Sequence, residues 1–86
     1  MQVTAAVVRE QGTTFAIVLV RPHVISNSHE ASDAVAAFTP VFGGVPVVLM
    51  AQDGRGRPTY YGRPDIARFM SHVPLQAVRW KRYTIN

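Results

Sequence analysis

The side chains best suited to chemistry in this sequence are cationic, and they are concentrated near its end. Arg79, Lys81 and Arg82 follow one another closely, with Trp80 and Tyr83 between and after them. Guanidinium and ammonium groups bind phosphates and carboxylates, and neighbouring aromatic rings stack on nucleic-acid bases. The run therefore predicts a surface for an acidic protein or a nucleic acid. The alternative interpretation is an edge strand whose charges prevent aggregation.

Four further arginines belong to the same half of the chain, and three of them join the candidate surface. Residues 44–86 hold seven cationic and two acidic residues, whereas residues 1–43 hold two cationic and three acidic ones. If the folded chain brings the basic residues together, we expect a binding surface of Arg55, Arg57, Arg63, Arg79, Lys81, Arg82 and Tyr83. For the first two, a place at the tip of a hairpin is the ordinary explanation. Tyr60 and Tyr61 are further candidates for stacking.

Little else in the sequence points to catalysis or metal binding. There is no cysteine, which excludes disulfides, thiol chemistry and cysteine-ligated metals. His29 and Asp33 are spaced so that they can pair or share a metal on a helix, but no third ligand follows at regular spacing. Each acidic residue has a structural explanation as a hairpin, cap, turn or helix-surface residue. We therefore expect a non-catalytic domain with no catalytic residues, no metal and no cofactor.

The first half of the chain predicts a hairpin followed by a helix. Residues 2–10 and 14–21 are rich in β-branched side chains and flank Gln11-Gly12-Thr13, where glycine permits a turn. Asn27 and Glu30 have the spacing of a helix cap whose acidic side chain reaches back. Apolar residues recur at helical spacing from Ala31 to Phe38, which predicts a buried helix face ending near Pro40.

The second half predicts a strand, a turn, a short strand, a helix and a final strand. These elements cover residues 45–52, 53–56, 59–61, 64–73 and 77–85. In the last strand, Arg79, Lys81 and Tyr83 share one face and Trp80 lies on the other. We expect Trp80 to anchor the strand and the basic row to face water. The 86 residues thus predict a single α/β (α+β) domain, residues 1–86, with order ββαββαβ, a mixed five-strand sheet and two helices.

The placement of the helices decides whether a second copy is needed. Two right-handed connections between parallel strands, one through each helix, put the helices on opposite faces if the sheet grows in chain order. Residues 15–20 are apolar on both sides, as in a strand covered twice. The alternative places both helices on one face and leaves an apolar face for a homodimer or another subunit.

Two resemblances to known proteins add to this interpretation. From Phe15 to Val73, the order βαββα, with Gly44-Val45-Pro46 and Tyr61-Gly62, resembles the C-terminal half of the thioredoxin-like fold. The resemblance implies a cis proline at Pro46 beside a peptide groove. Residues Val24–Ser28 stand where the family has its Cys-x-x-Cys motif. The resemblance therefore implies a peptide-binding domain without redox activity. Residues 43–53 and 60–66 are similar to small uncharacterised bacterial proteins, which implies a host class and no function.

The sequence gives no reason to expect a membrane partner. Its longest apolar runs, residues 15–20 and 45–51, are far shorter than the ~20 residues that span a bilayer. Met1 is followed by neither a basic segment nor an apolar segment of secretory length. We therefore expect a cytoplasmic location.

Overall fold

A mixed five-strand sheet forms the centre of the protein in the computed structural model, which describes residues 1–10 and 12–85. The strands are β1 (Gln2–Glu10), β2 (Thr13–Leu19), β3 (Val47–Gln52), β4 (Pro58–Tyr61) and β5 (Lys81–Thr84). The helices are α1 (Pro22–Ser26), α2 (Ser28–Phe38) and α3 (Pro64–Met70), with 3-10 turns η1 (Pro40–Phe42) and η2 (Leu75–Ala77). The predicted fold class, a single α+β domain of order ββαββαβ, is confirmed.

The strand order is β4-β3-β2-β1-β5, so the last strand joins the first and not the fourth. β2 and β3 are parallel, and the other neighbours are antiparallel. It follows that β4 and β5 run in opposite directions at opposite edges. The expectation that α3 connects two parallel strands is therefore wrong. Proline at position 58 lacks the N–H group that a further ladder beside β4 would use, and the edge of β1 receives β5 instead.

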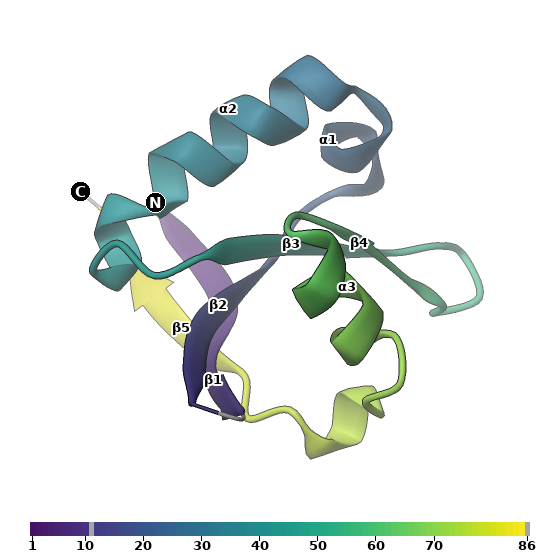
Figure 1. Cartoon of the computed structure of the whole chain (residues 1–86). Helices are drawn as coiled ribbons and strands as arrows, with labels where there is room; N and C mark the ends of the chain where they lie inside the picture. The colour runs from purple at the N-terminus through teal and green to yellow at the C-terminus, as the bar shows by residue number, and fades with distance from the viewer. Residues whose placement is uncertain (11, 86) are drawn as a thin grey trace.

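Helices cover both faces of the sheet, as the apolar pattern of β2 predicts (Figure 1). On one face, Ala16, Val18 and Leu49 pack under α1 and α2. On the other face, Ile17 and Val48 pack against α3, η2 and the segment leading to β5. The alternative with both helices on one face is wrong. The physical cause is alternation, because successive apolar residues of β2 and β3 point to opposite sides and both sides must be buried.

Several element boundaries differ from the sequence prediction. Strand β3 begins two residues later than expected, after Pro46, and β5 begins at Lys81 because residues 75–77 form η2. Helix α1 and the turn η1 are additional, and α3 ends at Met70. In the predicted hairpin turn, Gly12 has a φ of 78°, whereas Gln11 lies outside the described residues. The order of the five strands and the two main helices is nevertheless as predicted.

The cap of α2 is formed in part as predicted. The Oδ1 atom of Asn27 accepts a hydrogen bond of 3.1 Å from the backbone N–H of Glu30. The Glu30 carboxylate does not reach back, because it lies 3.5 Å from Nε2 of His23 on the unpredicted helix α1. Ala31 is fully buried, and the apolar residues at helical spacing after it pack on the sheet as expected.

Candidate functional site: the basic β5 edge

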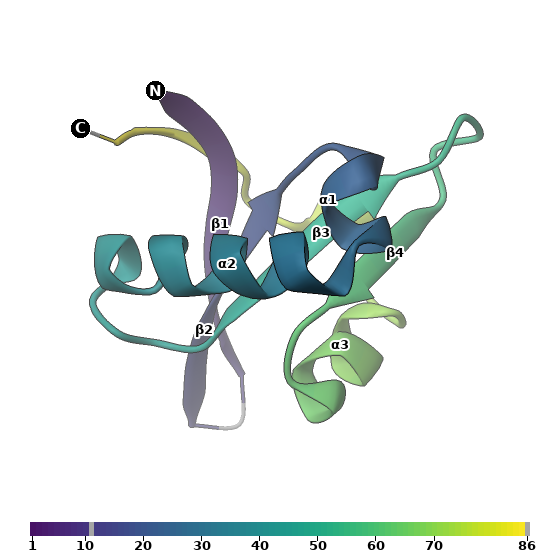
Figure 2. The same ribbon diagram turned by 90° about the horizontal axis from the view of Figure 1, so that it is seen from above.

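The sheet order divides the predicted basic residues into two groups. Arg55, Arg57 and Arg63 belong to the β3–β4 hairpin and the start of α3. Arg79, Lys81 and Arg82 lie on β5 and the segment before it, at the opposite edge of the sheet. Figure 2 shows the β3–β4 hairpin projecting on the side opposite to the chain termini. The structure therefore does not bring the predicted surface together as one patch.

Asp53 organises the hairpin turn and forms an ion pair with one of its two arginines, Arg57. Its Oδ1 atom accepts hydrogen bonds from the backbone N–H groups of Arg55, at 2.8 Å, and Arg57, at 3.0 Å. Its Oδ2 atom accepts one of 3.1 Å from Nε of Arg57. The backbone N–H of Arg57, followed by that of Arg55, lowers the pKa of Asp53 below its ordinary value. The predicted role of Asp53 as a turn residue is confirmed.

Arg63 is also paired with a carboxylate. Its Nη2 atom donates a hydrogen bond of 2.7 Å to Oδ2 of Asp65, and its Nε atom donates one of 3.2 Å to Oδ1. This pair of hydrogen bonds raises the pKa of Arg63 and lowers the pKa of Asp65. Arg63 is consequently held at the start of α3 and offers less free charge to a ligand.

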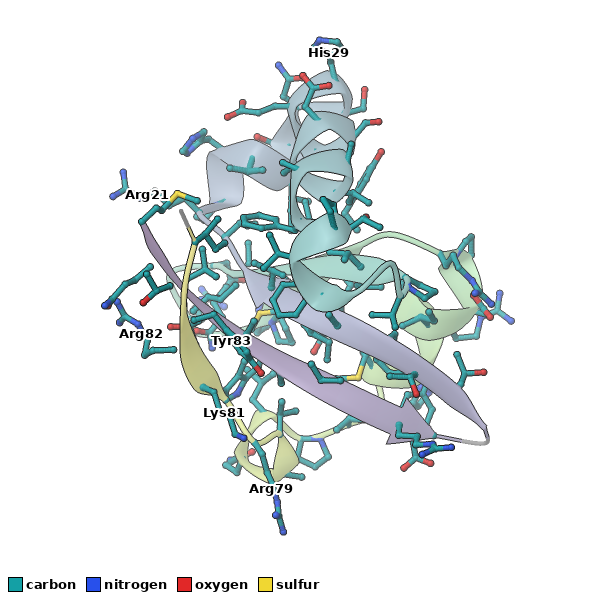
Figure 3. All side chains as sticks on the ribbon, turned by 90° about the vertical axis from the view of Figure 1, so that its left-hand side faces the viewer. Arg21, His29, Arg79, Lys81, Arg82 and Tyr83 are labelled. Atoms are coloured by element: carbon teal, nitrogen blue, oxygen red, sulfur yellow. The ribbon has the colours of Figure 1, made fainter. Side chains whose placement is uncertain are left out.

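The second group consists of Arg79, Lys81 and Arg82, and we call it the basic β5 edge. Its side chains are not paired with carboxylates of the described residues. Among the described residues, no carboxylate lies within 4.0 Å of their charged groups. Arg82 instead donates a hydrogen bond of 3.0 Å from Nη2 to the neutral amide oxygen of Gln2. All three side chains are exposed, and Arg79 and Arg82 project outward in Figure 3. Of the two predicted basic groups, this edge is the one in which no side chain has a carboxylate partner among the described residues.

The aromatic residues beside the basic β5 edge are packed into the two cores. Trp80 is half-buried against the α3 side of the sheet, which confirms its predicted role as an anchor. Tyr83 is half-buried on the other side, where its ring lies 5.1 Å from that of Phe42 at 76°. The expectation that Tyr83 faces water beside the basic row is wrong. The cause is the turn η1, an element that the sequence did not predict. Its residue Phe42 packs against the Tyr83 ring.

Tyr60 and Tyr61, the other two candidates for stacking, also pack against the cores. Tyr60 and Tyr61 are half-buried and pack on opposite faces of the sheet. The hydroxyl of Tyr60 is buried with no hydrogen-bond partner in the described part of the chain, and burial raises the pKa of this group. The described tyrosines near the basic residues are thus partly buried by core packing, and Tyr61 also lines a groove beside Pro46.

A shallow, mostly apolar groove of about 450 Å³ lies beside Pro46, between α2, β3 and the start of α3. The thioredoxin-like resemblance places a peptide here next to a cis proline. The Val45–Pro46 peptide bond is trans, since no described peptide bond is cis. The feature that the resemblance implies at Pro46 is therefore not present.

The histidines form local contacts only. His29 lies 3.4 Å from Asp33 through Nε2 and Oδ2, and both side chains are largely exposed. Nδ1 of His72 lies 3.0 Å from the carbonyl oxygen of Arg68, near the end of α3. Within residues 1–10 and 12–85, no group of three or more histidine and acidic side chains is arranged to hold a metal ion.

Comparison with known proteins adds no assignment. No protein family, curated protein or solved structure matches this chain significantly. Within the described part of the chain, the helices are too short and too polar for any of them to cross a membrane.

Proposed function

We propose that this protein is a non-catalytic binding module that holds an acidic polypeptide along the basic β5 edge. The observation that supports the proposal is the difference between the two basic groups: in the first, Arg57 and Arg63 are paired with carboxylates and only Arg55 is not, whereas none of the three cations at β5 is paired with a carboxylate of the described residues. Exposed cations whose charge is not compensated within the chain attract acidic partners over roughly the Debye length, about 10 Å at 0.1 M salt.

An acidic polypeptide suits this edge better than a nucleic acid does. Binding of single strands depends on aromatic rings that stack on bases as well as on basic side chains. Trp80 and Tyr83 are half-buried and packed against the cores, so they offer no such platform. A carboxylate needs only the guanidinium and ammonium groups, which remain exposed.

The test is binding of a labelled peptide rich in glutamate, measured by fluorescence polarisation at low ionic strength. We expect measurable affinity that falls steeply as salt is added. The double variant Lys81→Gln/Arg82→Gln should bind about fivefold more weakly, since two exposed ion pairs contribute together on the order of 1 kcal/mol.

A matched control separates this edge from general attraction to a cationic protein. The double variant Arg55→Gln/Arg68→Gln removes the same charge from exposed positions away from β5 and should keep most of the affinity. Equal losses in the two double variants would show that only net charge matters. Tight binding of single-stranded DNA without binding of the peptide would contradict the choice of partner.

A further inference from the structure

The hydrogen bonds between β1 and β5 determine which backbone groups of β5 face outward. Met1 and Ile85 form a pair in which each N–H donates to the other's carbonyl oxygen, at 3.1 Å and 2.7 Å. In an antiparallel ladder such pairs alternate with pairs that are not hydrogen-bonded. Tyr83 and Lys81, opposite Val3 and Ala5, therefore direct their N–H and C=O groups toward β1.

The same alternation directs the N–H and C=O groups of Arg82 and Thr84 away from the sheet. These two residues lie opposite Thr4 and Gln2 in the pairs without backbone hydrogen bonds. No strand lies beyond β5 in the described sheet. The outer side of β5 thus presents donors and acceptors spaced as an added strand requires.

The other outermost strand, β4, is less able to accept a strand. Asp53 donates a backbone hydrogen bond of 3.0 Å to the carbonyl oxygen of Arg57, which identifies the hydrogen-bonded pairs of the β3–β4 ladder. Pro58 and Tyr60 then occupy the outward positions of β4. Because Pro58 has no N–H group, that edge lacks a donor at one of these positions. The two ends of the sheet are therefore chemically different.

We infer that the acidic partner is an extended segment that adds to the sheet as a further strand beside β5, an inference that rests on the proposed function. The backbone of this segment pairs with Arg82 and Thr84. Lys81 lies on the α2 side of the sheet and Arg82 on the α3 side, because neighbouring residues of a strand alternate. Two consecutive acidic residues of the added strand place one carboxylate beside each cation.

The charges also argue against a second copy of this chain as the added strand. Neighbouring strands lie about 4.8 Å apart. Two copies paired through β5 would bring both sets of Lys81 and Arg82 well within a Debye length of about 10 Å. An acidic strand gains attraction from the same geometry.

Hydrogen exchange of individual amides tests the strand directly, with the full chain and the glutamate-rich peptide as the probe. We expect the amides of Arg82 and Thr84 to exchange quickly in the free protein and at least tenfold more slowly when the peptide is bound. The amides of Lys81 and Tyr83, which already face β1, should change little. Binding without protection of Arg82 and Thr84 would overturn strand addition and leave the proposed function intact.

The variant Thr84→Pro removes one outward N–H group at an exposed edge position, where proline is tolerated in strands. We expect it to weaken peptide binding about tenfold, and Thr84→Ala, which keeps the N–H, to bind almost normally. A peptide of the same charge with every backbone nitrogen methylated, which has no N–H group to donate from either edge, should bind as weakly to the unmodified protein.

The outcomes distinguish the two proposals. If Lys81→Gln/Arg82→Gln loses affinity but the methylated peptide still binds normally, charge alone holds the partner and strand addition is wrong. If the unmethylated peptide does not bind at low ionic strength, the proposed function fails and strand addition fails with it.

Discussion

Among the described glycines, Gly62 is the one at which an added side chain would fit worst. It joins β4 to α3 with a φ of 155°, and a Cβ atom there would lie 2.8 Å from Cγ2 of Val48 and 3.1 Å from its Cα. Part of this clash is with backbone and cannot be relieved by rotating a side chain. We expect Gly62→Ala to lower the free energy of unfolding by about 2 kcal/mol, measured by urea denaturation.

Gly54 provides the control at the same scale. A Cβ added there meets no atom within 4 Å. Gly54→Ala should therefore change the free energy of unfolding by no more than about 0.5 kcal/mol, as surface substitutions usually do. If both variants unfold at the same urea concentration, the close approach of Gly62 to Val48 does not constrain the fold.

At the scale of elements, the start of α2 depends on one side chain. The hydrogen bond from the Glu30 N–H to Asn27 is the cap that satisfies a free amide of the first turn. Asn27→Ala should destabilise the protein by about 1 kcal/mol, whereas Asn27→Ser, which keeps a capping oxygen, should cost much less. Thermal unfolding monitored by circular dichroism measures both. Equal melting temperatures for the alanine variant and the unchanged protein would contradict this role.

Local patterns were sufficient to predict most elements, because caps, turn residues and apolar periodicity act over a few residues. Asn27, Asp53 and the apolar face after Ala31 are examples. The exceptions are elements that depend on distant contacts. The turn η1 packs Phe42 on Tyr83, about half the chain away, and no signal near residues 40–42 indicates this contact.

At the scale of the whole molecule, the sequence could not show which edge receives the last strand. That choice decides whether the basic residues form one surface or two groups. Gln2, which binds Arg82, was missed for the same reason, because the two residues meet only when β5 pairs with β1. In retrospect, Pro58 is the one local signal, since a proline on the outer side of a strand disfavours a further partner.

The basic β5 edge also determines how copies of this protein behave toward one another. Helices cover the central strands on both faces of the sheet, and the open edge of β5 offers a route to self-association by strand pairing. Charge on β5 opposes that pairing. We expect sedimentation at low ionic strength to give a single species of 9.5 kDa.

Removing the charge should remove this protection. In Lys81→Gln/Arg82→Gln, the outward backbone groups of Arg82 and Thr84 remain available while the repulsion between copies is reduced, so the average mass should rise with protein concentration. Adding Thr84→Pro to the same variant should return it to a monomer, because a donor of the open edge is lost. A dimer of the unchanged protein at low ionic strength would mean that charge does not keep the copies apart. Association of the double variant that Thr84→Pro leaves unchanged would place the contact away from β5.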